Sequence, residues 1–240
     1  MEGINLSGKL KNKIKSFVQG LDNIYGTELV SVVIYGSAAS GEFVERHSNL
    51  NVLIVLKNTG LEDIKKAFGL MSKYRLIKPL FMTEEYINSS TDVFPIEFLD
   101  MQENYSVLYG KDVLKDIKVD TRNLRFQCEG ELKAKLLSLK HMYMTVNRNK
   151  ETLRQLLLKS FTSILHIMRN ILRLKGKKPA YKKEELLKEI SGEFSVDISI
   201  WQKILQAKKR EVKLRGQEIE TIFSGFVNDL EKVAALLDNL

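Results

Sequence analysis

The sequence predicts an α+β protein in which a mixed sheet with helices occupies residues 1–120 and an all-α helical bundle occupies residues 121–240. Three observations predict this class. Runs of β-branched residues alternate with helical segments in the first half, whereas apolar residues in the second half recur only at helical spacing. The balance of charge also changes between the halves. The chain has 240 residues, of which 44% are hydrophobic, so two small domains can each bury a core.

Strands and helices alternate in the first half. β-Branched residues dominate the runs at 29–35 and 51–56, and further strands are predicted near 76–81 and 95–99. An N-terminal amphipathic helix is predicted because Leu10, Ile14, Phe17, Val18 and Leu21 recur at helical spacing. Shorter helices are expected at 61–71 and 84–87. These elements together describe a small α/β domain with a mixed sheet.

Helical spacing of apolar residues dominates the second half. It predicts helices at 129–146, 152–174, 183–190, 198–207 and 218–237. The second of these carries an apolar stripe wide enough for the centre of a bundle. Gly176 and Pro179 follow it, as is typical of the end of a helix.

The charge differs between the two halves. Residues 1–120 contain 14 Lys and Arg against 16 Asp and Glu, and residues 121–240 contain 24 against 14. The excess is either a solvated lysine-rich face or a surface that attracts RNA, DNA or a nucleotide. Its clusters are residues 173–178 with Lys182 and Lys183, and residues 208–210 with Lys213 and Arg215. Only Tyr181 and Trp201 lie near them, so single-stranded nucleic-acid binding is weakly supported.

Composition excludes several classes of protein. A single cysteine, Cys128, excludes an internal disulfide framework and a cysteine-rich zinc site. No apolar run approaches the roughly 18 residues that a membrane-spanning helix needs. The first residues lack the basic and apolar regions of a signal peptide. A cytoplasmic protein with no membrane partner is therefore expected.

The turn after the first strand is the first candidate site. The strand runs into Gly36-Ser37, and small residues directly after a buried strand allow the backbone to approach a ligand closely. If a helix begins there, its N–H groups and the Ser37 hydroxyl would face an anion. The next strand opens after a short connection, with Ser48-Asn49-Leu50-Asn51 at its start.

This order of residues resembles the signature of the DNA polymerase beta-like nucleotidyltransferase superfamily. That signature is a Gly-Ser, a short helix, and two aspartates flanking one residue where the next strand begins. Gly36-Ser37, Gly41 and residues 48–55 match it, and the resemblance extends over about residues 25–115. The helical second half is similar to the bundle that follows this domain in kanamycin nucleotidyltransferase-like proteins. The resemblance implies a nucleoside triphosphate as ligand, with Gly36, Ser37 and Ser48 as nucleotide-binding residues.

Two asparagines depart from the signature. Asn49 and Asn51 stand where active relatives carry the aspartates that bind two divalent metal ions. Alternate residues of a strand point to one side, so both positions face the same way. A neutral amide is a poor substitute, because Mg²⁺ is held by carboxylate charge together with substrate phosphates. The metal positions are therefore degenerate, and Mg²⁺ binding is doubtful.

A third carboxylate is expected on a neighbouring strand, where it often serves as general base in this superfamily. Glu97 is the candidate, because an acidic residue amid Pro95, Ile96 and Phe98 is seldom placed there for burial alone. Asp100 is the second choice, since strand parity places it on the opposite face. The alternative is that Glu97 lies at a sheet edge or pairs with a lysine. Glu42 and Glu45, in the connection, could also shift a metal site.

The remaining titratable residues suggest packing. His47, His141 and His166 have no metal-ligand spacing, and His166 is expected to be a core imidazole. Cys128 has no neighbour that would lower its pKa. Arg169-Asn170 begins the pattern of a HEPN-type ribonuclease, but no histidine follows within the required distance, so this activity is disfavoured.

Three functions remain open. The first is a protein that binds a nucleotide or other phosphate-bearing small molecule with weak or no catalysis. The second is an active nucleotidyltransferase that moves a nucleoside monophosphate to a small molecule or protein, with Glu97 and unusual ligands in place of the aspartates. The third is an interaction module whose helical bundle pairs with itself, as a homo-oligomer, or with a partner.

Overall fold

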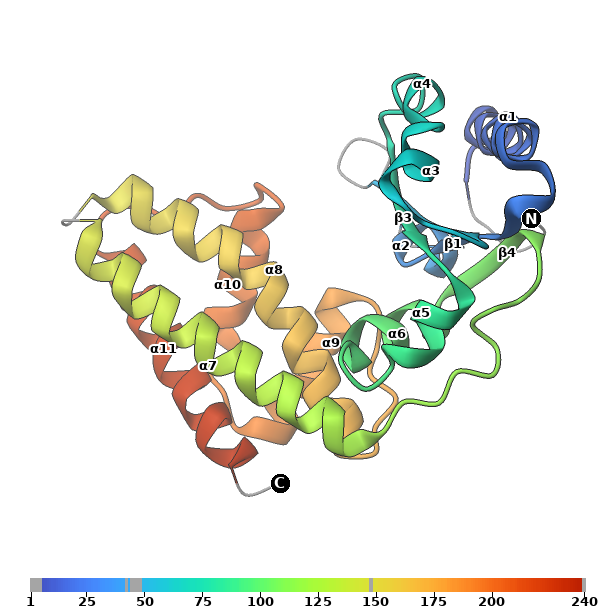
Figure 1. Ribbon diagram of the computed structural model, residues 1–240. Helices are drawn as coiled ribbons and strands as arrows, with labels where there is room; N and C mark the ends of the chain where they lie inside the picture. The colour runs from blue at the N-terminus through green and yellow to red at the C-terminus, as the bar shows by residue number, and fades with distance from the viewer. Residues whose placement is uncertain (1–5, 42, 44–48, 147–148, 239–240) are drawn as a thin grey trace. The chain divides into compact units, whose positions relative to one another are not determined.

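The computed structural model describes residues 6–41, 43, 49–146 and 149–238. The chain divides into two compact units, residues 1–120 and residues 121–240, here called the sheet unit and the helical unit (Figure 1). Each unit has a core of its own and is described separately.

The sheet unit contains a four-stranded mixed sheet with the strand order β3-β2-β1-β4. The central strand β1 (Leu29–Tyr35) is antiparallel to both β2 (Leu50–Leu56) and β4 (Tyr105–Gly110), whereas β2 is parallel to β3 (Ile77–Met82). The predicted mixed sheet is thus confirmed. Pro79 lies in β3 at the edge of the sheet, where a residue without an N–H is tolerated.

Helices cover both faces of this sheet (Figure 1). One face packs on α1 (Gly8–Tyr25) and on the short helices α2 (Ser37–Ser40) and α4 (Phe68–Met71). The short helix α3 (Leu61–Lys65) precedes α4, and η1 (Gly26–Glu28) leads into β1. The other face packs on α5 (Glu84–Ser89) and α6 (Pro95–Glu103). Val32, Ile34, Val52 and Ile54 serve the first core, and the alternate residues of these strands serve the second.

The strand predicted at 95–99 is wrong. This segment is helix α6, and the fourth strand of the sheet is β4, at 105–110. Alternation of Ile96 and Phe98 fits a strand, but Pro95 occupies the first helical turn, where its missing N–H costs nothing. Ile96, Phe98 and Met101 are all buried, which helical spacing permits. The helix predicted at 61–71 is likewise divided into α3 and α4.

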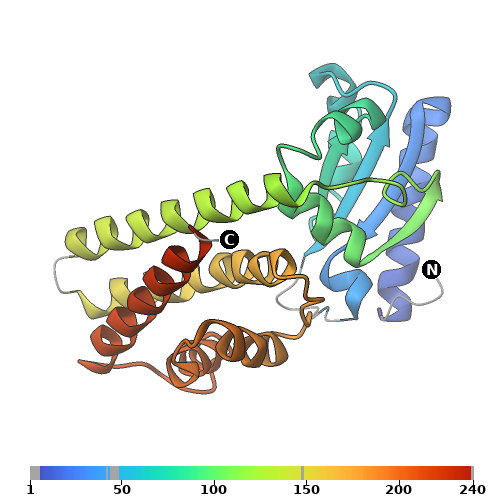
Figure 2. The same cartoon turned by 90° about the horizontal axis from the view of Figure 1, so that it is seen from below.

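The described part of the helical unit consists of five helices and no strand: α7 (Thr121–Thr145), α8 (Lys150–Leu174), α9 (Lys183–Phe194), α10 (Ile198–Lys208) and α11 (Glu218–Leu237). The two long helices α7 and α8 run side by side, and α11 packs on both (Figure 2). The apolar stripe of α8 is buried, with Phe161, Ile164 and Met168 all fully covered. The predicted all-α architecture is confirmed.

A buried carboxylate joins two helices of this unit. Asp229 in α11 is 2% exposed. It accepts hydrogen bonds from the Trp201 Nε1 of α10 and from the backbone N–H of Asp197, both at 3.0 Å. The Trp201 ring packs against Phe226 of α11 and Phe161 of α8. Asp229 therefore fixes the start of α10 against α11 at the centre of the unit.

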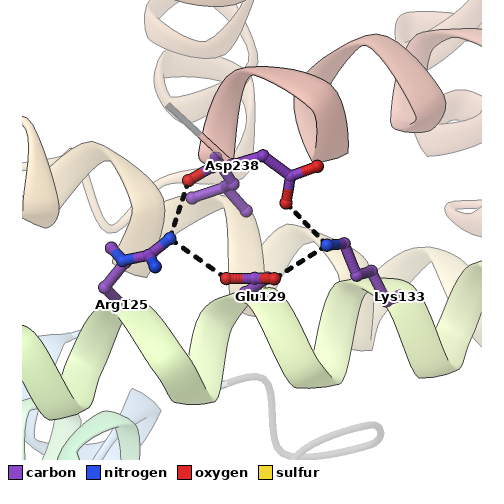
Figure 3. A network of polar contacts seen from close by, with 5 residues as sticks. Arg125, Glu129, Lys133 and Asp238 are labelled. Carbon is purple, nitrogen blue, oxygen red and sulfur yellow. Dashed lines mark hydrogen bonds and ion pairs between the residues drawn. The ribbon is translucent and has the colours of Figure 1, made fainter. Parts of the chain in front are cut away.

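A second polar network holds the C-terminal end of α11 on α7 (Figure 3). Arg125 Nη1 donates to Glu129 Oε2 at 3.0 Å and to the Leu237 carbonyl at 2.9 Å. Lys133 Nζ lies 2.7 Å from Glu129 Oε1 and 2.6 Å from Asp238 Oδ1. The bond to the Leu237 carbonyl satisfies a backbone group that the end of a helix leaves without a partner.

Within the described ranges, none of the helices combines the length and the hydrophobicity that crossing a lipid bilayer requires.

Replacement of Asp229 by alanine is expected to destabilise the helical unit by roughly 2–4 kcal/mol, because the buried Trp201 Nε1 and the backbone N–H of Asp197 lose their acceptor. Glu231→Ala, on the same helix, is the control: it removes only the half-exposed pair with Lys140 and is expected to cost about 0–1 kcal/mol. Urea unfolding followed by the fluorescence of Trp201, the single tryptophan, measures both. Equal costs for the two variants would contradict the role of Asp229.

Acid is expected to weaken the network of Figure 3. The hydrogen bond from Lys133 lowers the pKa of Asp238 below its ordinary value of 3.8, so the unfolded chain binds this proton more readily than the folded chain. The stabilisation is therefore complete above that value and is lost as the pH falls below it. Between about pH 6 and about pH 3, native protein should lose more unfolding free energy than Asp238→Asn. Identical losses would show that Asp238 contributes nothing.

Candidate functional site

The turn that follows β1 is built on a glycine. Gly36 has φ +73° and ψ −140°, a conformation that L-residues with a side chain rarely adopt. Its N–H donates to the Asn104 carbonyl at 2.9 Å, and its own carbonyl accepts from the N–H groups of Ala39 and Ser40, both at 3.0 Å. Both the N–H and the carbonyl of Gly36 are thus used in hydrogen bonds within the protein, and Ser37 is the next residue along the chain.

A helix begins at Ser37, as predicted, but it is a single turn. Helix α2 covers only Ser37–Ser40 and ends at Gly41, which adopts the left-handed conformation with φ +83°. Four residues give little of the dipole that a longer helix supplies at its N-terminus. The turn therefore offers a close approach and the half-buried Ser37, but little electrostatic attraction of its own.

A row of four residues crosses the sheet beside this turn, and we call it the polar row. Asn51 of β2 is in register with Tyr35 of β1 and with Lys78 of β3, and Tyr35 is in register with Tyr105 of β4. Residues in register share a face, and neighbouring strands lie about 4.8 Å apart. Lys78 and Asn51 therefore lie side by side where β1 ends and β2 begins. Sequence reasoning missed Lys78 because only the strand pairing reveals its neighbour.

Among the polar row, the tyrosines add no charge. Burial raises the pKa of Tyr35 above its ordinary value. Burial, and then the hydrogen bond to Asp112 at 3.0 Å, raise the pKa of Tyr105 to about 12. Both phenols are neutral at physiological pH, so the formal charge of the polar row is the single positive charge of Lys78.

Carboxylates are absent from the sheet. The four strands, all of them described, contain no Asp or Glu. Asn49 is exposed and directly precedes β2, and Asn51 is half-buried within it. Among the described residues, no group of three or more His, Cys, Asp or Glu could hold a metal ion. The oxygen ligands that Mg²⁺ prefers are carboxylates, so the described residues around the polar row do not fit a two-metal centre.

Glu97 is not on a strand that neighbours β2. It is exposed on α6, a helix whose buried residues face the second core, and Asp100 is half-buried on the same helix. The expected placement of Glu97 on a strand is therefore wrong, whereas its role as a base stays a prediction. Ser48, Glu42, Glu45 and His47 lie outside the described residues.

The remaining residues that the sequence analysis considered lie in helices of the helical unit. Cys128 is fully buried in α7, His166 is half-buried in α8, and His141 is exposed on α7. Arg169 is only 9% exposed; its guanidinium donates to the Tyr181 carbonyl at 2.8 Å and lies 4.7 Å from the centre of the Tyr181 ring. Arg169 thus holds the segment after α8 against that helix.

Several members of the basic clusters are already paired with acids. Lys175 and Lys177 both contact Glu193, and Lys209 contacts Glu184. Lys208 donates to the Leu158 carbonyl at 2.9 Å, and burial lowers its pKa. Internal pairing reduces the charge that these clusters could offer to a nucleic acid.

A small acidic cleft adjoins Tyr105, the member of the polar row that is farthest from Lys78. It has a volume of about 110 Å³ and is lined in part by Glu84, Lys111, Asp112 and Asp116. Glu84 pairs with Lys111, and Asp112 accepts the hydroxyl of Tyr105. Three carboxylates against one ammonium disfavour a phosphate here, so the polar row is the better candidate for an anion.

Replacement of Gly36 by alanine is expected to destabilise the sheet unit by roughly 1–3 kcal/mol, because a Cβ strains the backbone at φ +73°. Gly69→Ala in α4 is the matched control: no atom lies within 4 Å of the added Cβ, and stability should be unchanged or slightly higher. Hydrogen exchange of the β1 and β2 amides measures both. Unchanged protection in Gly36→Ala would show that the turn tolerates a side chain and does not require glycine.

Comparison with known proteins supports the fold. No protein-family model matches the chain, and no curated protein sequence is significantly similar to it. A solved structure of spectinomycin adenyltransferase AAD(9) from Enterococcus faecialis, with ATP and spectinomycin, is similar in three dimensions. The TM-score is 0.59 at 12% sequence identity, and the match covers 94% of this chain and 100% of that chain. At this identity the likeness speaks for the fold alone: the chain has a nucleotidyltransferase-like fold.

Proposed function

We propose that this protein binds a nucleotide, or another phosphate-bearing small molecule, beside Gly36 and Ser37, with weak or no catalytic activity. The single observation that carries the proposal is the absence of carboxylates from all four described strands of a nucleotidyltransferase-like sheet. The fold supports the class of ligand, and the residues at the strand ends argue against the reaction.

Binding is supported by the turn and its surroundings. Gly36, at the end of β1, allows a ligand to approach the backbone closely, and Ser37 adds a hydroxyl beside it. Asn51 and Lys78, on the adjacent strands, add an amide and an ammonium. The similar adenyltransferase was solved with ATP and spectinomycin, which makes a nucleotide the first ligand to test.

Weak catalysis is inferred from charge. Nucleotidyl transfer depends on positioning and on stabilising the charge of the attacking and leaving oxygens. In the superfamily that the sequence resembles, two aspartates hold the metal ions that do so, and here Asn49 and Asn51 stand at the matching positions. An amide oxygen carries no full charge, so the site holds a divalent cation less tightly.

A second candidate is an active nucleotidyltransferase that moves a nucleoside monophosphate to a small molecule. The observation in its favour is the likeness to an adenyltransferase solved with a small-molecule antibiotic. Glu97 would then be the base, acting from helix α6 rather than from a strand.

Calorimetric titration with ATP, GTP, CTP and UTP tests the proposal. The native chain should bind at least one nucleotide no more tightly with Mg²⁺ than with a chelator. The double variant Asn49→Asp/Asn51→Asp should bind metal-free nucleotide about tenfold or more weakly, since two carboxylates would face the phosphates. Mg²⁺ should recover part of that loss in the variant but not improve binding by the native chain.

Two results would contradict the proposal. Strictly Mg²⁺-dependent binding by the native chain, with release of pyrophosphate when an acceptor is supplied, would favour the active enzyme. A lack of nucleotide binding by both proteins, together with a stable oligomer, would favour an interaction module.

A further inference from the structure

We infer that Lys78 occupies the place of a metal ion in this site, so that the ligand is a metal-free phosphate group held directly by an ammonium. The inference rests on the proposed function, and it names the charged group and the form of the ligand. Three features of the sheet unit carry it: the register of β3, the surroundings of Lys78, and the chemistry of the donors beside it.

The register places Lys78 next to Asn51. Strands β2 and β3 are parallel, with Asn51 opposite Lys78 and Leu53 opposite Leu80. Leu53 and Leu80 both belong to the second core, so Lys78 and Asn51 share the face that these leucines occupy. The resemblance implies an acidic residue on a strand adjacent to β2, and β3 presents an ammonium instead.

The Lys78 side chain is available to a ligand. It is exposed, and it forms no ion pair with any residue that the structure describes. Some other lysines of the sheet unit are paired, among them Lys57 with Glu28 and Lys111 with Glu84, so their charge is partly neutralised within the fold.

The chemistry of the donors suits an oxyanion. An ammonium provides three N–H donors and an asparagine amide provides two, whereas ionised carboxylates only accept. Asn49 and Asn51, at the two positions expected to hold a metal, can donate hydrogen bonds through their amides, and Lys78 beside Asn51 adds one positive charge. Such a set repels a divalent cation and favours phosphate oxygens. A nucleoside triphosphate without bound Mg²⁺, or another phosphate ester, is the class of ligand that fits.

The test compares Lys78→Gln with Lys57→Gln. Both variants lose one positive charge from the same sheet, but Lys57 follows the far end of β2. Binding of ATP and of inorganic tripolyphosphate is measured by calorimetry in the presence of a chelator. Lys78→Gln should weaken binding roughly 10- to 100-fold, as expected for a charge-assisted hydrogen bond, and Lys57→Gln should change it less than about threefold.

A second measurement uses the native chain and so does not depend on the folding of any variant. Lysines are acetylated with an amine-reactive reagent, with and without tripolyphosphate, and the modified sites are quantified by mass spectrometry. Lys78 should be protected by the ligand, and Lys57 should not.

The outcomes separate this inference from the proposed function. Equal affinities of the two variants, with Lys78 unprotected, would overturn the role of Lys78 and leave phosphate binding intact. Lys78 would then serve only as an edge-strand lysine, which discourages pairing with a second chain. Binding that requires Mg²⁺ would overturn the inference directly. If the native chain bound neither ATP nor tripolyphosphate, the proposed function itself would fail.

Discussion

The antiparallel pairing of β1 with β2 is the constraint on which the candidate site depends. The interiors of both strands are buried, and each supplies alternate residues to two different cores. A slip of one residue would turn Asn51 into the first core and expose an apolar side chain in its place, so the register is strongly specified. That register sets Tyr35 opposite Asn51, and the parallel pairing of β3 then brings Lys78 alongside. Gly36, which has a positive φ, terminates β1 at this same end of the sheet.

In the helical unit, polar contacts mainly maintain internal order. Asp229 joins α10 to α11 from the core, and the Arg125–Glu129–Lys133–Asp238 network holds α11 on α7 from the surface. The clustered lysines that the sequence offered as a possible anion-binding surface are also paired: Lys175, Lys177 and Lys209 contact glutamates of helix α9. Our inference about function therefore rests on the single positive charge of Lys78 and not on the larger excess of the second half.

Much of the fold could be predicted because local patterns and burial agree. The β-branched runs become β1 and β2, and the helical spacings become α1 and the bundle. The prediction was wrong at 95–99, where the apolar residues fit both the alternation of a strand and the three-residue spacing of a helix, and Pro95 was the signal for the helix. The placement of Glu97 on a strand was part of the same error. Lys78 could not be found from the sequence, because its significance lies in a neighbour 27 positions away that only strand register identifies.

The polar row lies at the ends of strands whose buried middles hold the sheet together. Of the polar row, Lys78 is exposed and Asn51 is half-buried, and Asn49 beside the row is exposed. None of these three side chains is a principal support of either core. Substitutions at these three positions should therefore cost little folding stability, because the stability of the cores depends on buried apolar volume and not on the charge at the strand ends. On a scaffold of this kind, a few substitutions at the strand ends can change the charge of the site without rebuilding the interior.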